Sequence, residues 1–302
     1  MGRAVAIVGP TASGKSGVAL AVARALGDAE LVSVDAMQVY RGMDIGTAKP
    51  SPAEQAEVPH HLIDLVEPAD EFTLAAFQSA YRAARADIVE RGRRAVLVGG
   101  TGLYLRAAVD DLDIPGQWPT LRAELETAAE ADVAALHRRL VELDPAAAAK
   151  MEPTNTRRIV RALEVGLGSG RPFSSFGPGL DAYPPTDIAL LGLRWARPAL
   201  AARVAARVEQ MMAAGLLDEV RGLAAAGPLS RTARQALGYK ELLDHLEGRC
   251  DLAEAVATIV TRTRQFAVRQ DRWFRRDPRI RWFDVTTDPS EAIATVLEAA
   301  AA

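Results

Sequence analysis

A segment near the N-terminus, Gly9-Pro-Thr-Ala-Ser-Gly-Lys-Ser16, has the spacing of a phosphate-binding loop. It follows an apolar run and precedes a helical pattern, which is the context that this motif requires. The loop N–H groups, the helix N-terminus and the Lys15 ammonium all favour an anion, and the Ser16 hydroxyl is a ligand for Mg2+. We therefore predict a diphosphate site whose contacts are Gly9, Pro10, Thr11, Ala12, Ser13, Gly14, Lys15 and Ser16.

Three further polar residues follow buried-strand patterns. Asp35 comes directly after one apolar run and Gln38 lies three residues later, while Thr101 lies in a glycine-rich turn after another run. Open α/β sheets bind ligands at the carboxyl ends of their strands, so these side chains are expected to face the phosphate loop. Asp35 could accept a proton or ligate Mg2+ through water, or could only form a turn, and the Gln38 amide could read an adenine edge.

The loop predicts phosphate binding but no particular reaction, because most proteins with this motif are nucleotide hydrolases or kinases. Such enzymes usually carry a Mg2+-binding Asp at the end of a second buried strand. Here the run Ala95 to Val98 ends in Gly99-Gly100-Thr101-Gly102, without a carboxylate. Asp35 is left as the candidate acid or base.

The first half of the chain alternates short apolar runs with helical patterns, which is typical of an α/β fold with a parallel sheet flanked by helices. Helices are predicted near 15–26 and 73–91, and a closing helix at 289–301. The predicted strands are Ala4 to Val8, Leu31 to Val34, Leu62 to Val66, Ala95 to Val98, Ile188 to Leu193 and Ile280 to Asp284.

A helical insertion interrupts this α/β core. After Leu112, Pro115, Gly116 and Pro119 break the pattern, alanine- and charge-rich helical segments run to about Gly168, and a Gly, Pro and Ser stretch leads back to the sheet. We predict a core formed by residues 1–112 and 186–302, with a helical insertion domain at 113–185.

Composition excludes several classes of protein. The 302 residues are 49% hydrophobic and 25% charged, which suits a globular protein, and no apolar run is long enough to cross a membrane. A single cysteine, Cys250, excludes an intrachain disulfide, and a cytoplasmic location is expected. The net charge is −3, yet eight arginines lie between Arg262 and Arg281 against two aspartates, a local excess that could face a polyanion.

Several blocks of the sequence resemble one family. They are GPTASGKS, VSVDAMQVYRGMDIGTAKP, VPHHLIDLVEP, VLVGGTGLYLRA, RRIVRALEV, QALGYKEL and TRQFAVRQDRWFRR. In this order they resemble the tRNA dimethylallyltransferases, also called tRNA isopentenyltransferases or the IPP transferase family. The resemblance runs from Val5 to about Phe283, and the blocks DIGTAKP and GGTGLY are far more specific than the phosphate motif.

The resemblance implies a P-loop NTPase-like core and transfer of a dimethylallyl group from dimethylallyl diphosphate to N6 of the adenosine directly 3′ of the anticodon. The tRNAs are those that read codons beginning with U, diphosphate is the second product, Mg2+ assists, and the protein is a monomer. Because the N6 lone pair is delocalised into the ring, a proton must leave as the C–N bond forms, a role suited to Asp35. The loop, Lys15 and Mg2+ would stabilise the leaving diphosphate, and the adenine must be flipped to reach the site.

The family's functional residues fall on matching positions. Asp35, Thr101 and Lys15 are the expected catalytic residues, Ser16 is the expected Mg2+ ligand, and the anticodon stem-loop is expected to contact residues from five parts of the chain. These tRNA-binding positions are Asp35, Ala36, Met37, Gln38, Thr101, Arg122, Arg157, Arg158, Ile159, Val160, Arg161, Gln235, Ala236, Leu237, Gly238, Tyr239 and Lys240.

Two positions depart from the family's pattern. Ala36 replaces a common serine, and Gln235 stands where some relatives have an arginine that clamps the diphosphate, so either Arg234 or Gln235 could make that contact. Three other hypotheses compete with the tRNA prenyltransferase: a small-molecule kinase or ATPase, a prenyltransferase for free adenine nucleotides, and an RNA-binding module without catalysis. The last leaves Asp35 and Lys15 unexplained, and the second would not need the insertion.

Overall fold

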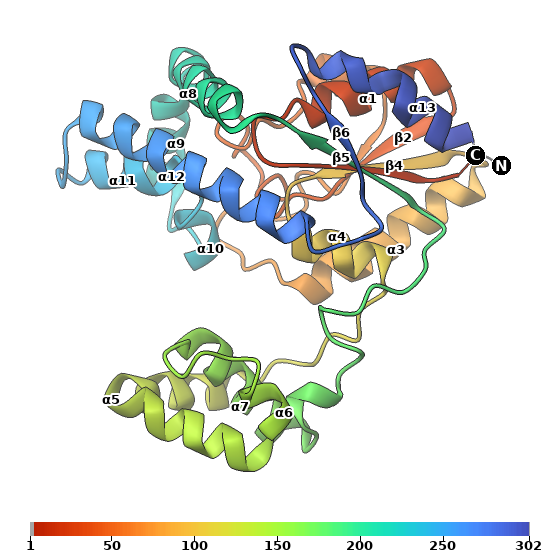
Figure 1. Cartoon of the computed structure of the whole chain (residues 1–302). Helices are drawn as coiled ribbons and strands as arrows, with labels where there is room; N and C mark the ends of the chain where they lie inside the picture. The colour runs from red at the N-terminus through yellow and green to blue at the C-terminus, as the bar shows by residue number, and fades with distance from the viewer. Residues whose placement is uncertain (1–2, 302) are drawn as a thin grey trace. The chain divides into compact units, whose positions relative to one another are not determined.

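The computed structural model describes residues 3–301, and within them six parallel strands form one sheet in the order β3-β2-β4-β1-β5-β6 (Figure 1). Each pair of neighbouring strands is parallel, as the alternating sequence pattern predicts. The strands are β1 Val5–Val8, β2 Ala29–Ser33, β3 His60–His61, β4 Arg94–Gly99, β5 Ala189–Arg194 and β6 Arg281–Asp284. The predicted α/β class is confirmed.

Helices cover both faces of the sheet because its central strands are apolar on both faces. The residues of β1 are all buried, and α1 (Lys15–Leu26) and α13 (Ile293–Ala301) pack on one face (Figure 1). On the other face lie α3 (Leu74–Glu90) and α4 (Gly102–Val109). This arrangement directs the loops after β1, β2 and β4 to one edge of the sheet.

A second apolar cluster joins the segment after β2 to the C-terminal helices. Its centre contains the buried side chains of Tyr40, Met43, Val220 and Tyr239. The helices that contribute to it are α8 Arg197–Ala213, α9 Leu216–Ala226, α10 Arg231–Arg234, α11 Tyr239–Leu246 and α12 Leu252–Phe274. Elsewhere in this unit, α2 spans Pro52–Glu57 and a short 3-10 turn, η2, spans Pro289–Ala292 and packs with the first cluster. None of the helices in residues 3–301 combines the length and apolarity of a membrane span.

The predicted strand Leu62 to Val66 is wrong. Leu62 and Asp64 have φ of 63° and 53°, which an extended strand cannot contain. The two residues before this run, His60–His61, pair with β2 instead, and Val66 makes only an isolated bridge with Tyr40. Asp64 forms an ion pair with Lys49. The run therefore adopts a turn that makes this tertiary contact, although its apolar pattern is typical of a strand.

The chain divides into two compact units, and the second is residues Asp111–Ala182. It contains α5 Pro119–Leu143, α6 Pro145–Ala148, α7 Thr156–Ser169 and a 3-10 turn η1 at Phe173–Ser175. Leu125, Leu140, Ile159 and Leu163 form its own core. The unit starts two residues before the predicted insertion and ends three residues earlier than predicted.

A buried ionic cluster in the first unit lies where the chain leaves for the insertion and returns from it. The Arg279 guanidinium pairs with Asp110 at 2.6 Å and with Asp277 at 2.6 Å, and donates to the Pro184 carbonyl at 2.7 Å. These partners hold the pKa of Arg279 above its usual value. Arg279, one of the eight clustered arginines, is thus largely buried among its partners, contrary to the expectation that the run faces a polyanion.

Candidate active site

The phosphate loop joins β1 to α1 and presents free backbone donors. In the described residues no acceptor contacts the N–H groups of Ala12, Gly14, Lys15 and Ser16. The Lys15 ammonium lies 3.3 Å from the Pro10 carbonyl oxygen. Free N–H groups at a helix N-terminus, with a cation beside them, form a binding site for an anion such as a phosphate group.

Residues far along the chain hold this loop in place. The Gln270 side chain of α12 accepts a hydrogen bond from Thr11 N at 2.8 Å and donates one to the Gly100 carbonyl at 2.8 Å. Trp195 and Arg203 donate to the carbonyls of Ser13 and Ala12, at 2.9 and 2.8 Å. The loop conformation therefore depends on α8, α12 and the end of β5, and no local sequence pattern distinguishes these three side chains.

Asp35 and Thr101 lie at the edge of the sheet that carries the phosphate loop. The Asp35 carboxylate accepts a hydrogen bond from Met37 N at 2.8 Å, and the Thr101 hydroxyl accepts one from Ala36 N at 3.0 Å. These bonds fix the turn after β2 against the turn after β4. The structure thus brings two of the predicted catalytic residues together, and Thr101 also supports the backbone beside Asp35.

The glycines around Thr101 are required by close packing. A β-carbon on Gly99 would lie 2.1 Å from the Val34 carbonyl oxygen, and one on Gly102 would lie 2.0 Å from the Trp273 ring. A larger residue at Gly99 would push β4 away from the end of β2, and one at Gly102 would push α4 away from α12. Close packing around the GGTG segment therefore fixes the position of Thr101. The same packing leaves no room for a carboxylate side chain at Gly99 or Gly102.

Electrostatic coupling places Lys15, Asp35 and an unpredicted residue, Arg207 of α8, close to one another. Burial and, to a smaller extent, the Arg207 charge lower the pKa of Lys15, the Asp35 carboxylate opposes both effects, and the resulting pKa is about 8. Burial also lowers the pKa of Arg207, and Asp35 again opposes the shift. Two desolvated cations thus lie within electrostatic reach of one carboxylate, which suits an anionic ligand with two or more charges.

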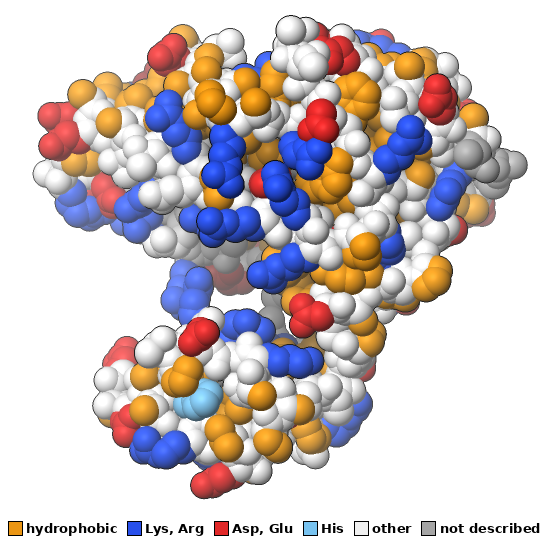
Figure 2. All heavy atoms as spheres, viewed as in Figure 1, with side chains coloured by type: hydrophobic (Ala, Val, Ile, Leu, Met, Phe, Trp, Pro, Cys, Tyr) orange, Lys and Arg blue, Asp and Glu red, His pale blue; other side chains and the backbone are white. Residues whose placement is uncertain are grey.

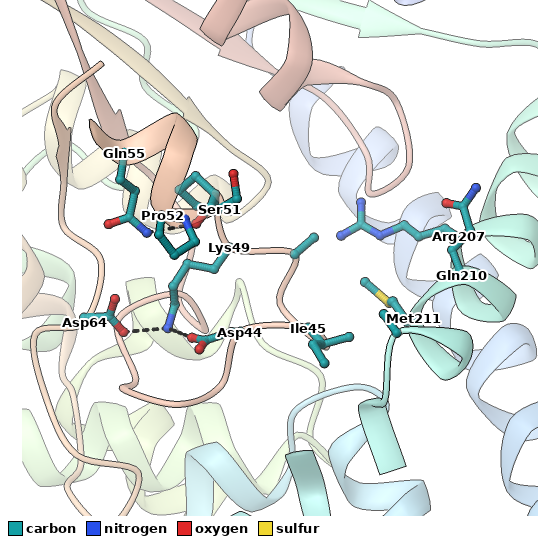
Figure 3. Close-up of a pocket in the computed structure, with 13 residues that line it drawn as sticks. Asp44, Ile45, Lys49, Ser51, Pro52, Gln55, Asp64, Arg207, Gln210 and Met211 are labelled. Atoms are coloured by element: carbon teal, nitrogen blue, oxygen red, sulfur yellow. Dashed lines mark hydrogen bonds and ion pairs between the residues drawn. The ribbon is translucent and has the colours of Figure 1, made fainter. Parts of the chain in front are cut away.

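A hollow of about 650 Å³ extends from Arg207 between α8 and the segment after β2 (Figure 3). Ile45 and Ala48 line one side, and Gln210 and Met211 line the other. In Figure 3 the Arg207 side chain points across the gap toward that segment. The hollow is wide enough for a small organic ligand.

The Gln38 amide bonds to the protein itself. It donates to the carbonyls of Thr47 and Ala48, at 3.2 and 3.1 Å, and accepts from the Ser33 hydroxyl at 2.7 Å. Its orientation is therefore fixed before any ligand arrives.

The second unit carries the other predicted arginines. Arg157 and Arg158 are exposed at the start of α7, whereas the side chains of Ile159 and Val160 are buried in the core of that unit. Arg161 donates to the carbonyls of Pro115 and Gly116, at 2.8 and 2.9 Å. Of this segment, the two exposed guanidinium groups have the greatest freedom to contact a ligand.

A buried carboxylate, Glu164, lies beside Arg122, which is the other arginine of the second unit predicted to bind tRNA. Arg122 and Arg161 approach it at 3.7 and 3.1 Å, and Trp118 N donates to it at 2.9 Å. Arg122 also pairs with Glu126 at 3.2 Å. The Arg122 guanidinium is therefore held in place at the start of α5.

The segment from Gln235 to Lys240 is divided between surface and core. Gln235 is exposed, whereas Tyr239 is fully buried. Ala236 and Gly238 are also buried, and Leu237 and Lys240 are half-buried. The neighbouring Arg234 pairs with Glu247 at 2.6 Å. Of the two candidates for a diphosphate contact, Arg234 thus has a protein partner.

Lys and Arg side chains gather along α12 on the face of the molecule in Figure 2. Among the residues of α12, Arg264, Arg269 and Arg272 are exposed. In the same run Arg262 pairs with Glu241 at 2.6 Å and Arg275 pairs with Asp271 at 2.8 Å. The buried side of this helix carries Gln270, so one helix holds the phosphate loop and presents cations to solvent.

The donor set fits a magnesium ion that is held mainly by its phosphate ligand. The Ser16 hydroxyl is exposed at the start of α1, and no described residue hydrogen-bonds to it. Residues 3–301 contain no cluster of three or more His, Cys, Asp or Glu side chains that could hold a metal alone. Mg2+ commonly binds through substrate phosphates with one or two protein ligands, so Ser16 is compatible with it.

The fold and the site together define a P-loop enzyme with an acidic residue, Asp35, beside its anion site. The IPP transferase family model matches residues 38–277. The chain is 50% identical to a tRNA dimethylallyltransferase of Kineococcus radiotolerans, over 97% of this chain and 95% of that protein, and 49% identical to one of Streptomyces coelicolor, over 93% and 89%. The chain belongs to the IPP transferase family and is a transferase.

Solved structures agree with this assignment. A tRNA isopentenylpyrophosphate transferase of Bacillus halodurans matches with a TM-score of 0.72 and 39% identity, over 99% of this chain and 95% of that one. A eukaryotic dimethylallyltransferase acting on tRNA matches with a TM-score of 0.78 and 26% identity, over 97% of this chain and 76% of that one. The predicted P-loop NTPase-like fold and the family resemblance are confirmed.

Proposed function

We propose that this protein transfers the dimethylallyl group of dimethylallyl diphosphate to N6 of the adenosine directly 3′ of the anticodon, in tRNAs that read codons beginning with U. The observation that carries the proposal is the position of Asp35 at the sheet edge that carries the phosphate loop, beside Thr101 and within electrostatic reach of Lys15 and Arg207. A base close to an anion site suits the attack of an amine on an allylic diphosphate. The protein works as a cytoplasmic monomer.

The phosphate loop and its cations bind the leaving group. Free loop N–H groups, Lys15 and Arg207 hold the diphosphate, and their positive charge stabilises the negative charge that develops as the allylic C–O bond breaks. Bound Mg2+, with Ser16 among its ligands, would neutralise further diphosphate charge. Phosphorus is never attacked, which distinguishes this use of the loop from that of a kinase.

On the other side of the reacting carbon, Asp35 accepts the proton that N6 loses as the C–N bond forms. The adenine leaves its stack to reach this carboxylate. Thr101 and the Asp35–Gln38 segment line its approach, and the segment Gln235–Lys240 supports it. Arg122 and the Arg157–Arg161 segment of the insertion bind the anticodon stem-loop.

One assay tests the proposal. The protein is incubated with an unmodified tRNA that reads a U-initial codon, Mg2+ and dimethylallyl diphosphate, and the nucleosides are analysed by mass. We expect a dimethylallyl mass increment on the adenosine beside the anticodon and an equal amount of diphosphate. Phosphate release from ATP without prenyl transfer would favour a kinase or ATPase, and transfer to free AMP alone would favour a nucleotide prenyltransferase.

Donor binding should depend on pH through Lys15. Its pKa is about 8 in the free protein, and a bound diphosphate raises it, so binding above that pH takes up a proton. The affinity for dimethylallyl diphosphate should be highest below about pH 8 and fall by up to about tenfold per pH unit above it. Calorimetry in two buffers of different ionisation enthalpy measures the uptake. The variant Lys15→Met should lose this proton uptake.

A further inference from the structure

Glu219, in the first turn of α9, gathers four hydrogen bonds from two distant parts of the chain. Its carboxylate accepts from the backbone N–H groups of Asp44, Ile45 and Gly46, at 3.0, 2.7 and 3.2 Å, and from the Tyr239 hydroxyl at 2.5 Å. Three successive N–H groups that converge on one carboxylate form an anion-binding nest, here filled by the protein itself. Glu219 therefore fastens the turn at 44–46 to α9 and α11.

The packing around this carboxylate leaves the turn little freedom. A β-carbon on Gly46 would lie 2.4 Å from the Tyr239 ring, and Tyr239 is fully buried. The Thr47 hydroxyl closes the turn by donating to the Met43 carbonyl at 2.6 Å. Without the carboxylate, three backbone donors and a phenol would lose their acceptor, a cost that favours displacement of the turn.

The same turn holds a residue that the proposed function places against the RNA. The carbonyls of Thr47 and Ala48 accept both hydrogen bonds of the Gln38 amide nitrogen. Ile45 lies opposite Met211 in the hollow (Figure 3), and Ala48 also lines it. A shift of the turn would therefore move Gln38.

We infer that Glu219 is a positioning residue for the RNA substrate: by fixing the turn at 44–48 it holds Gln38 in the orientation that receives the RNA. This inference rests on the proposed function. Glu219 contacts neither the phosphate loop nor Asp35 through any hydrogen bond of the described residues, so its loss should leave the chemical step and the donor site intact.

The test is Glu219→Gln, which keeps the shape of the side chain but replaces one acceptor oxygen by an NH2 donor. We expect KM for tRNA to rise and kcat/KM for tRNA to fall by roughly 10- to 100-fold, the scale of leaving one buried donor without its acceptor. Both kcat and KM for dimethylallyl diphosphate should stay within about threefold. A merely structural role would lower the active fraction, and hence kcat, without changing either KM.

Two measurements that need no catalysis complete the test. Amide hydrogen exchange at residues 44–46 should accelerate in Glu219→Gln, and the Kd for the anticodon stem-loop should rise by roughly the same factor as KM. The matched control is Asp218→Asn on the same helical turn, where the side chain is 79% exposed and pairs with Arg221; it should behave like the wild type.

Unchanged RNA affinity, unchanged exchange at 44–46, or a fall in kcat alone would overturn the role of Glu219 while leaving the proposed function in place. A wild-type protein that neither binds nor modifies tRNA would overturn the proposed function. In that case accelerated exchange at 44–46 would still show that Glu219 holds this turn in place, and its assignment to RNA positioning would be rejected together with the proposed function.

Discussion

Replacement of Asp35 by asparagine should lower the rate of prenyl transfer to tRNA by roughly 100- to 10,000-fold, the usual contribution of a general base. Asparagine keeps an oxygen that can accept the Met37 N–H, so the turn after β2 should survive. What it lacks is a basic site for the N6 proton. The rate is measured in single turnovers with labelled dimethylallyl diphosphate and saturating tRNA.

The control for this experiment separates chemistry from binding. Near neutral pH, Asp35→Asn should bind donor and tRNA within about threefold of the wild type, because the loop N–H groups and the arginines remain. Asp187→Asn removes an exposed carboxylate that pairs with Arg85 and should leave the rate unchanged. Turnover by Asp35→Asn at the wild-type rate would show that another group accepts the proton.

The parallel sheet and the phosphate loop could be predicted because local pattern and tertiary role agree there. The residues of β1 are apolar and buried on both faces, and the loop that follows has a spacing set by its own backbone. The position of Asp35 and Thr101 followed from the rule that strand ends share one edge of the sheet. These predictions did not require knowing which side chains of distant segments contact one another.

The missed residues depend on contacts that no local pattern records. Gln270 bonds to Thr11 across 259 residues of chain, and nothing in the α12 pattern distinguishes it from its neighbour Gln265. Arg207 is one of several arginines on α8, and only the fold brings it beside Lys15. Such residues are selected by tertiary packing, so a single sequence cannot separate them from surface charges.

Some residues predicted to contact the RNA are buried in the protein, which the sequence motif alone does not indicate. The segment from Arg157 to Arg161 reads as one block, yet its middle residues Ile159 and Val160 belong to the core of the second unit. Arg279 reads as part of a cationic run but neutralises Asp110 and Asp277. Helical periodicity assigns faces, whereas the identity of the buried partner requires the neighbouring chain segments.

Replacement of Lys15 by methionine should lower kcat/KM for dimethylallyl diphosphate by roughly 100- to 1,000-fold, the scale of removing one preorganised group that stabilises developing charge. Methionine retains the apolar stem, and Lys15 makes one long hydrogen bond to the loop, so the loop should stay folded. Arg24→Met, in the last turn of the same helix, removes an exposed cation paired with Glu57 and should have no effect.

The pH dependence of this defect identifies its cause. Because the pKa of Lys15 is about 8, the free wild-type protein loses the charge as pH rises above that value, whereas Lys15→Met has none to lose. The ratio of wild-type to variant kcat/KM should therefore be largest below about pH 8 and shrink above it. A ratio that stays constant from neutral to alkaline pH would mean that Lys15 acts through the shape of the loop, and that Arg207 and the backbone donors hold the diphosphate without its charge.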